Sequence, residues 1–508
     1  MASEVFDLLI VGGGINGVGI ARDAAGRGLK VLLVEQHDLA SHTSSRSTKL
    51  IHGGLRYLEQ YEFRLVREAL QERERLLKIA PTIAWPLRFI LPHDRSLRPV
   101  WLIRAGLFLY DHIGGRISLP RSHGVRLRED PVGQPLKASF TRGFAYSDAW
   151  VQDSRLVTLN AMDAAERGAV IRTRTRLTHA ERQEGVWKAD LQPEGGPAET
   201  VRAHALVNAA GPWVDTVVRK ALGLEEAVHV RMVKGSHIVV PRLYDGDQAY
   251  ILQNRDKRIV FAIPYEDRFT LIGTTDEPFK GDPTNVEISA EETDYLCRII
   301  NQYFERQIAP SDVVWSYAGV RPLYDDAAAN ASTVTRDYVL RVDGGEDGHT
   351  PLLSIYGGKI TTYRRLAEHA MEKLVRYFKR PDLPGLNTGW TDTKPLPGGD
   401  IESFEAFLAA FRARHPWLPE ALSLRLAHAY GSRAELLIGD TEHLEDLGRN
   451  FGGGLTEAEA DYLMRHEWAR TAEDVLWRRS KVGLHAPPET ASALDAWMAM
   501  RAKQLAAA

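Results

Sequence analysis

Three glycines near the start of the chain have the spacing of a turn that binds dinucleotides. Gly12, Gly14 and Gly17 follow the pattern Gly-x-Gly-x-x-Gly. The first glycine of this pattern permits a tight turn, the second lets a pyrophosphate approach the backbone, and the third lets a helix pack closely against a strand. Glu35 follows at about 20 residues, where a carboxylate accepts hydrogen bonds from ribose hydroxyls. The spacing favours a bound dinucleotide over a glycine turn without a ligand, and the acid at Glu35 favours NAD or FAD over NADP.

The elements that such a turn requires surround these glycines. Residues 6–11 are nearly all apolar and predict a strand buried on both faces of a parallel sheet. Residues 15–27 have helical spacing, and residues 29–34 form a second apolar run after Gly28. Strand, turn, helix and strand in this order predict a βαβ unit whose helix directs free N–H groups and a positive dipole end at the phosphates.

Bulk properties narrow the class of protein. A chain of 508 residues is expected to fold as two or three domains. The net charge of −3 gives no basic field that would favour nucleic acid. The single cysteine, Cys297, excludes an internal disulfide and fits a reducing cytoplasm, and its helical surroundings predict a core position. The sequence contains no cysteine pair and no two histidines at ligand spacing, so it does not predict a metal site.

The remaining chain divides by pattern. Residues 60–80 predict an amphipathic helix, and residues 166–210 contain strand patterns. Residues 235–275 alternate with period two, which predicts antiparallel hairpins, one of them turning at residues 254–257. Proline and glycine make residues 380–400 the best linker candidate. Residues 401–508 have helical periodicity, including one helix over residues 458–478, and predict a separate helical domain.

The relation of the chain to membranes is predicted from three features. Its first residues carry neither the basic region nor the cleavage signature of a signal peptide. No apolar run reaches the roughly 18 residues of a spanning helix. Residues 85–110 mix tryptophan, leucine and phenylalanine with arginine, which suits an interfacial element. A buried segment with exposed arginines is the alternative interpretation of this stretch.

The segment at residues 43–58, TSSRSTKLIHGGLRYL, resembles the flavin-contacting segment of the FAD-dependent glycerol-3-phosphate dehydrogenases. Further blocks resemble the same family in the same order: residues 208–213, 234–237, 272–276, 316–322 and 357–364. The likeness runs from about residue 6 to the end of the chain and is close to the aerobic bacterial enzymes.

The resemblance implies an α/β fold of three parts within the amino-acid-oxidase-like flavoproteins. The first is a discontinuous FAD-binding domain of Rossmann type, expected at residues 1–85, 150–230 and 335–385. The second is a substrate domain with an antiparallel sheet, expected at residues 86–149 and 231–334. The third is an all-helical C-terminal domain at residues 395–508.

The resemblance also implies FAD as the cofactor. Hydroxyls and N–H groups of the matched blocks suit pyrophosphate and flavin edges, and a capped loop is the alternative for the serine-rich part. The residues expected to bind the cofactor are Gly12, Gly14, Ile15, Asn16, Gly17, Glu35, Thr43, Ser44, Ser45, Ser47, Lys49, Leu50, His52, Gly53, Gly54, Ala210, Gly211, Trp213, Gly358, Lys359 and Thr361.

The implied reaction is the oxidation of sn-glycerol 3-phosphate to dihydroxyacetone phosphate, with hydride transfer to the flavin. Electrons would pass to ubiquinone or another membrane quinone, on the anionic inner face of the cytoplasmic membrane. A phosphate dianion requires a cationic clamp, and the planar fork of arginine suits it. The residues expected to bind the substrate are Arg56, Tyr57, Arg321, Arg336 and Lys359. A surface ion pair is the alternative for any one arginine.

The general base is left open among three residues. His237 has an ordinary pKa in the range that suits a base, and His52 is the second candidate. Lys359 would polarise the substrate oxygen, or act as the base if burial lowered its pKa. With Arg321, these residues form the expected catalytic set. A hydrogen-bonded sheet residue is the alternative interpretation of His237.

Three other functions remain open. An oxidase would use the same substrate with oxygen as the acceptor. An amine or amino-acid oxidase would use one arginine for a carboxylate, whereas several arginines favour a phosphate. A non-catalytic flavin-binding or nucleotide-binding module would present the helical C-terminal domain to partners. The sequence does not determine the electron acceptor, the role of the C-terminal domain, or whether the chain forms a homodimer.

Overall fold

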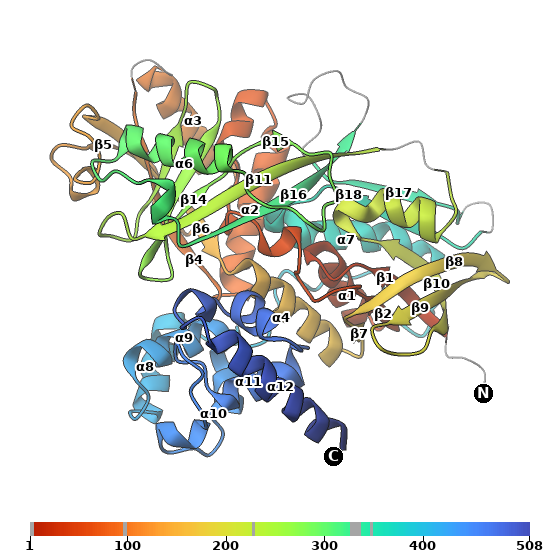
Figure 1. Cartoon of the computed structure of the whole chain (residues 1–508). Helices are drawn as coiled ribbons and strands as arrows, with labels where there is room; N and C mark the ends of the chain where they lie inside the picture. Colours follow the sequence, from red (N-terminus) through yellow and green to blue (C-terminus); the bar gives the residue numbers. More distant parts are fainter. Residues whose placement is uncertain (1–4, 95–98, 226–228, 326–336, 346–348, 508) are drawn as a thin grey trace.

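Two sheets and a helical C-terminal region make up the protein (Figure 1). The computed structural model describes residues 5–94, 99–225, 229–325, 337–345 and 349–507. The chain passes several times between the two sheets before it enters the C-terminal helices, drawn in blue in Figure 1. The boundaries of the expected domains stay a prediction, but each sheet draws its strands from segments far apart in the sequence.

The first sheet has the strand order β17-β18-β10-β1-β2-β7. Its central strands are parallel, β17 is antiparallel to β18, and a β8-β9 hairpin extends antiparallel from β10. The strands are β1 (Val5–Val11), β2 (Val31–Val34), β7 (Val170–Arg172), β8 (Thr175–Gln183), β9 (Val186–Pro193), β10 (Glu199–Asn208), β17 (Val339–Asp343) and β18 (Leu352–Tyr356). A parallel core with such crossovers is the expected Rossmann-type arrangement.

Both faces of this sheet are covered, as the apolar β1 predicts. Leu8 and Ile10 pack with α1 (Ile15–Gly26), α4 (Asp153–Glu166) and α7 (Tyr363–Leu374). Leu9 and Val11, which point to the opposite face, pack with the β8-β9 hairpin. The observed β1, α1 and β2 confirm the predicted βαβ unit.

The second sheet has the order β15-β11-β14-β13-β12-β4-β6-β3, with β16 paired to β11 and β5 to β6. Its strands are β3 (Leu50–Ile51), β4 (Ala84–Pro92), β5 (His123–Arg126), β6 (Arg142–Val151), β11 (His229–Pro241), β12 (Ala249–Gln253), β13 (Ile259–Tyr265), β14 (Phe269–Gly273), β15 (Glu277–Pro278) and β16 (Trp315–Asp325). The predicted hairpin is confirmed, since Ile251 of β12 pairs with Phe261 of β13 in antiparallel register.

Helices cover both faces of the second sheet. α6 (Ala290–Tyr303) packs on one face, and Cys297 lies buried there, as predicted. Burial raises the pKa of the Cys297 thiol to about 11, so the thiol stays protonated at neutral pH. α2 (Phe63–Ile79), the predicted amphipathic helix, and α3 (Val100–Ile113) pack on the other face.

The predicted interfacial element over residues 85–110 is wrong for its first part. Residues 85–90 belong to β4, which lies between β6 and β12 in the interior of the second sheet. Phe89 and Ile90 are almost completely buried, because strand pairing places them in the cores on the two faces of the sheet. The second part forms α3, which exposes several large apolar side chains. Among the described residues, no helix is long and apolar enough to cross a membrane.

The C-terminal region is helical and has its own core, as predicted. Its α-helices are α8 (Phe404–Arg414), α9 (Glu420–Tyr430), α10 (Ala434–Ile438), α11 (Glu457–His466) and α12 (Thr490–Ala507). The single helix predicted over residues 458–478 is wrong. α11 ends at His466, Trp468 adopts a left-handed backbone with φ of 57°, and a short π-helical stretch follows at Asp474–Arg479.

Buried ion pairs attach this region to the first sheet. Both terminal nitrogens of Arg479 donate to the carboxylate of Asp38, at 2.6 and 2.8 Å, and Arg478 donates to the same carboxylate at 2.7 Å. Asp38 belongs to the loop that follows β2, so the C-terminal region holds the chain just before the predicted flavin-contacting segment. The predicted linker at 380–400 has no helix or strand, but buried residues such as Thr391 and Leu396 pack it against the rest of the protein.

Candidate active site

The turn between β1 and α1 has room only for glycine. Gly12 has a φ of 115°, which side chains rarely tolerate, and a Cβ there would lie 2.5 Å from the carbonyl oxygen of Ala209. A Cβ on Gly17 would lie 1.9 Å from the carbonyl oxygen of Gly12. These close contacts follow from the packing of α1 on β1 and β10. The turn therefore has the steric properties that the Gly-x-Gly-x-x-Gly pattern predicts.

The first turn of α1 presents N–H groups without an acidic partner. Gly14 caps the helix with no side-chain hydrogen bond, and the first turn contains no acidic residue. Ile15 N–H donates to Ser44 Oγ at 3.0 Å, and Asn16 Nδ2 donates to the carbonyl oxygen of Gly357 at 3.2 Å. Predicted cofactor residues from three distant segments thus meet at one helix N-terminus. This positive, open end fits the pyrophosphate of FAD.

Glu35 lies directly beside the glycine turn. Its two carboxylate oxygens accept hydrogen bonds from the N–H groups of Gly13 at 2.6 Å and His37 at 2.8 Å. Burial raises the pKa of Glu35, and the two N–H groups oppose that shift. Each carboxylate oxygen has a second lone pair, so Glu35 retains acceptor capacity for ribose hydroxyls.

The predicted flavin-contacting segment, residues 43–58, crosses from the first sheet to the second. Thr43 Oγ1 donates to the carbonyl oxygen of Val320 in β16 at 2.7 Å. Ser47 Oγ donates to Asp153 at 2.8 Å, and Lys49 Nζ donates to both oxygens of Asp153 at 2.9 Å. Asp153 begins α4 and was not among the predicted site residues. Asp153 holds Ser47 and Lys49 in place. In this structure the side chains of these two residues therefore bond to the protein itself.

The second predicted cofactor turn follows β10. Gly211 has a φ of 55°, and Asn208 Oδ1 accepts from the N–H of Ala210 at 3.3 Å. The Trp213 ring packs edge-on against the His42 ring, with centroids 4.6 Å apart. Burial lowers the pKa of His42 to about 3, with a smaller contribution from His37, so the imidazole is neutral at physiological pH. This turn therefore adjoins the start of the flavin-contacting segment.

Four of the predicted site residues lie together: His52, Tyr57, Lys359 and Thr361. Lys359 Nζ lies 3.8 Å from the centre of the Tyr57 ring, and the N–H of His52 donates to Thr361 Oγ1 at 3.3 Å. Burial lowers the pKa of His52 to about 4, and the positive charges of Lys359 and then Arg73 lower it further. His52 is therefore a neutral imidazole beside a cation.

His237 lies in β11 and contacts the flavin-contacting segment directly. Its Nε2 is 2.9 Å from Thr48 Oγ1, and its ring stacks on Tyr317 with centroids 4.7 Å apart. Gly273 leaves the space that the ring occupies, since a Cβ there would lie 2.1 Å from it. Burial lowers the pKa of His237 well below its usual value, and Lys49 and Arg321 add to the shift. Its Nδ1 is buried and has no hydrogen-bond partner.

The structure describes two of the three arginines predicted to bind the phosphate, Arg56 and Arg321. Arg321 lies within β16 rather than at a strand end, and its Nη2 donates to Asp276 at 2.9 Å in a half-exposed ion pair. Arg56 is half-buried on a short 3₁₀ helix, Leu55–Gln60, next to Tyr57. Arg336 lies outside the described residues. In addition to burial, the positive charge of Arg321 lowers the pKa of His237. Lys359 lies over the Tyr57 ring, and its charge adds to the effect of burial in lowering the pKa of His52.

Two residues of the site, Tyr317 and Asp153, escaped sequence reasoning, whereas the hydroxyl of Thr48 is expected from the sequence to line the cofactor. Tyr317 stacks on His237, Asp153 binds Lys49, and Thr48 contacts His237. Tyr317 falls in a matched block, which is the one signal that was available for it. Asp153 carries no local signal, because its partner lies 104 residues away in the chain.

Comparisons with known proteins agree with this geometry. Residues 7–364 match the family model described as FAD dependent oxidoreductase, and residues 390–507 match the C-terminal domain of alpha-glycerophosphate oxidase. The chain is 55% identical over 487 residues to a glycerol-3-phosphate dehydrogenase of Pseudomonas aeruginosa, covering 96% of this chain and 93% of that one. It is 50% identical over 497 residues to a D-erythritol 1-phosphate dehydrogenase of Brucella abortus, covering 97% and 98%.

A solved structure has the same overall fold. The glycerol-3-phosphate dehydrogenase from Bacillus halodurans, determined in complex with FAD, superposes with a TM-score of 0.75 at 26% sequence identity. The likeness covers 94% of this chain and 86% of that one. The match includes both sheets and the C-terminal helices, so the three-part architecture is shared.

We predict that Gly17→Ala removes most of the bound FAD. The added methyl group would lie 1.9 Å from the Gly12 carbonyl oxygen, so the turn must shift. Overpacking of this kind costs about 1–3 kcal/mol, which corresponds to roughly a tenfold or greater loss of affinity. The visible absorbance of the flavin after gel filtration measures the effect.

Gly124→Ala is the matched control, because a Cβ at Gly124 meets no atom within 4 Å. We expect this variant to keep the flavin content of the wild type. Full flavin content in Gly17→Ala would contradict the assignment of the turn.

Proposed function

Because the chain belongs to the FAD-dependent oxidoreductases, we propose that it oxidises sn-glycerol 3-phosphate to dihydroxyacetone phosphate and passes the electrons to a membrane quinone. One observation carries this proposal: His237, a buried imidazole held neutral, contacts Thr48 of the flavin-contacting segment at 2.9 Å and is near enough to Arg321 for that positive charge to lower its pKa further. Such a residue accepts a proton while the neighbouring cation attracts an anionic substrate. The relative from Pseudomonas aeruginosa, which is named for this substrate, supports the choice.

In this proposal Arg321 binds the phosphate group. Its present partner, Asp276, forms an ion pair with about half of each side chain exposed. Exposed pairs of this kind contribute only about 0–1 kcal/mol, so a phosphate dianion displaces Asp276 readily. Arg56, Tyr57 and Lys359 lie with the other candidate imidazole, His52, and complete the set of polar groups for the substrate.

His237 takes the proton of the secondary hydroxyl in this scheme. When Nε2–H donates to Thr48 Oγ1, the unpartnered Nδ1 keeps the lone pair for this proton, and because Nδ1 is buried in this structure the scheme requires that it become accessible when substrate binds. The stacked ring of Tyr317 fixes the orientation of the imidazole. Bound FAD supplies the hydride acceptor. His52 remains the second candidate for the base, with Lys359 polarising the substrate oxygen.

D-erythritol 1-phosphate is a second candidate substrate, because the relative from Brucella abortus that is named for it is 50% identical. Both compounds join a phosphate ester to a secondary alcohol, so the same cations and the same base serve either one. Oxygen is a second candidate acceptor, because the C-terminal match is to a domain named for an oxidase.

We predict that sn-glycerol 3-phosphate bleaches the flavin absorbance of the FAD-loaded enzyme in an anaerobic titration. Addition of a soluble quinone analogue should then restore the absorbance, and turnover in air should release little hydrogen peroxide. Absence of bleaching would contradict the proposal and would favour a non-catalytic flavin-binding protein. Stronger bleaching by D-erythritol 1-phosphate would reassign the substrate, and stoichiometric peroxide would reassign the acceptor.

We predict an acid limb of kcat well below pH 6.5. The base acts when it is deprotonated, and burial lowers the pKa of His237, so the neutral form persists as the pH falls through 6.5. His237→Ala should lower kcat by about 10²–10⁴ while FAD stays bound. Near-normal turnover in His237→Ala, with a large loss in His52→Ala, would move the base to His52. An acid limb at or above pH 6.5 would contradict a buried neutral base.

We also propose that α3 contacts the inner face of the cytoplasmic membrane. Trp101 is 70% exposed and Phe108 is 65% exposed, and Arg104 lies on the exposed surface of the same helix. Large rings combined with arginine suit the headgroup region of an anionic bilayer.

The enzyme should therefore sediment with anionic vesicles at low salt and be released at high salt. The double variant Trp101→Ser/Phe108→Ser should lose most of this binding. Leu436→Ser is the control, since Leu436 is 65% exposed on α10 in the C-terminal region. Equal sedimentation of the double variant and the wild type would exclude α3 as the contact.

A further inference from the structure

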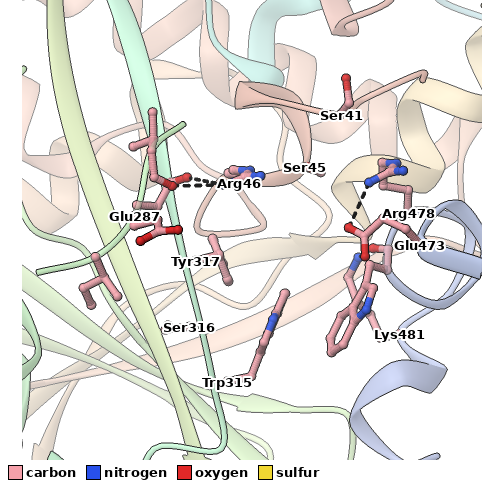
Figure 2. A pocket seen from close by; sticks show the side chains of 14 residues that line it. Ser41, Ser45, Arg46, Glu287, Trp315, Ser316, Tyr317, Glu473, Arg478 and Lys481 are labelled. Atoms are coloured by element: carbon pink, nitrogen blue, oxygen red, sulfur yellow. Dashed lines mark hydrogen bonds and ion pairs between the residues drawn. The ribbon is translucent and has the colours of Figure 1, made fainter. Parts of the chain in front are cut away.

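A cavity of about 530 Å³ lies where three parts of the protein meet (Figure 2). Ser45 and Arg46 come from the flavin-contacting segment, Trp315 comes from β16, and Arg478 and Lys481 come from the C-terminal region. Of the residues that line it, Ser45 alone belongs to the predicted cofactor and substrate sets. None of the residues proposed for catalysis, His237, His52, Lys359 and Arg321, lines the cavity.

Two cations in this cavity lack an acidic partner. Arg46 donates to the carbonyl oxygens of Ala318 at 2.9 Å and Val286 at 3.4 Å, and Lys481 donates to the carbonyl oxygen of Trp477. Within the part of the chain that the structure describes, neither side chain forms an ion pair; Glu473 acts on Arg46, and Asp153 and Glu266 act on Lys481, only through their charge. Neutral carbonyls satisfy hydrogen bonds but leave the positive charge uncompensated.

The cations of the cavity also repel one another. Burial lowers the pKa of Arg46, and Arg478 lowers it further. Burial lowers the pKa of Lys481 to about 7, Lys49 is the next cause, and Asp153 and Glu266 oppose the shift. The amine is therefore about half protonated at neutral pH, and an anion bound beside it would stabilise the charged form. Arg478 is already bonded to Asp38, Asp474 and Glu473.

The acidic lining does not remove this excess of positive charge. Glu473 is 62% exposed and is bonded to Arg478, and Glu287 is exposed at the rim. Figure 2 shows Glu473 beside Arg478 and Lys481 on one side of the space, and Glu287 near Arg46 on the other. A negative ligand would therefore gain from both unpaired cations at once.

One wall of the cavity is aromatic. Trp315 stacks on Trp477 with ring centroids 4.6 Å apart and an angle of 21° between the planes. Both rings line the cavity, together with the hydroxyls of Ser41 and Ser45. A wall of this kind contacts the carbon skeleton of a ligand, while the Ser41 hydroxyl can donate to its anionic head, since the Ser45 hydroxyl already donates to the carbonyl oxygen of His42 at 3.2 Å.

We propose that this cavity is a second ligand site, which binds a small organic anion with its phosphate or carboxylate group between Arg46 and Lys481 and its carbon skeleton against Trp315. The site is additional to the proposed catalytic cleft. It is connected to that cleft by Tyr317, which lines the cavity and stacks on His237. A ligand bound here therefore lies one side chain away from the proposed base.

The test is a titration of the FAD-loaded enzyme with phenyl phosphate, followed by tryptophan fluorescence. The proposal predicts saturable quenching that persists in Arg321→Met, because Arg321 belongs to the catalytic cleft. Lys481→Met should weaken binding by about tenfold, the usual loss when a hydrogen bond to a charged group is removed. Lys373→Met is the control, since this lysine is exposed on α7. Inorganic phosphate should compete with phenyl phosphate at this site.

Three results would overturn the proposal: no quenching in the wild type, equal affinity in Lys481→Met and the wild type, or loss of binding in Arg321→Met alone. Binding to FAD-free but not to FAD-loaded protein would also overturn it, because the cavity would then be part of the flavin site. If Lys481→Met does not fold with a normal flavin content, Arg46→Gln gives the same comparison, with the same expected and contradicting results.

Discussion

The attachment of residues 43–54 to the second sheet is the constraint on which the rest of the structure depends. Thr43 and Ser47 bond to β16 residues Val320 and Tyr317 at 2.7 and 2.8 Å, and Thr48 contacts His237 of β11 at 2.9 Å. The segment contacts the dinucleotide turn through Ser44 and the proposed proton acceptor through Thr48. Hydride transfer from a carbon and proton transfer from its hydroxyl group require an acceptor and a base at fixed positions, within about 3–3.5 Å of the reacting atoms. Joining the two sheets through one short segment meets this requirement.

The C-terminal region acts on the same segment from the other side. Asp38, five residues before Thr43, accepts hydrogen bonds from both Arg478 and Arg479. A buried charge cluster of this kind adds little net stability, but the loss of one partner leaves the others unpaired at a high cost in free energy. The cluster therefore fixes where the C-terminal helices sit. Arg478 of this cluster also lines the cavity that we assign to a second ligand, so the C-terminal region would have a role in ligand binding as well as in support.

Local pattern was sufficient to predict the βαβ unit, the antiparallel hairpins and the helical C-terminal region, because period and turn residues determine those elements within short windows. It failed for β4, whose mixture of tryptophan and arginine resembles an interfacial stretch. Pairing with β6 and β12 is what buries Phe89 and Ile90, and no local window contains those partners. It failed also at Trp468, where tertiary packing stabilises a left-handed residue that breaks an otherwise periodic helix. In the site, family resemblance identified His237 and Arg321. Their partners Tyr317 and Asp276 could not be assigned without the register of β11, β14 and β16.

A crystal structure of the FAD-loaded enzyme with dihydroxyacetone phosphate bound tests the central claim most directly. The account predicts that the flavin lies along residues 43–54, that the phosphate contacts Arg321 with the Asp276 bond broken, and that the ligand carbonyl oxygen faces His237 or His52. A flavin away from this segment, or a phosphate bound away from Arg321 with the Asp276 pair intact, would contradict it.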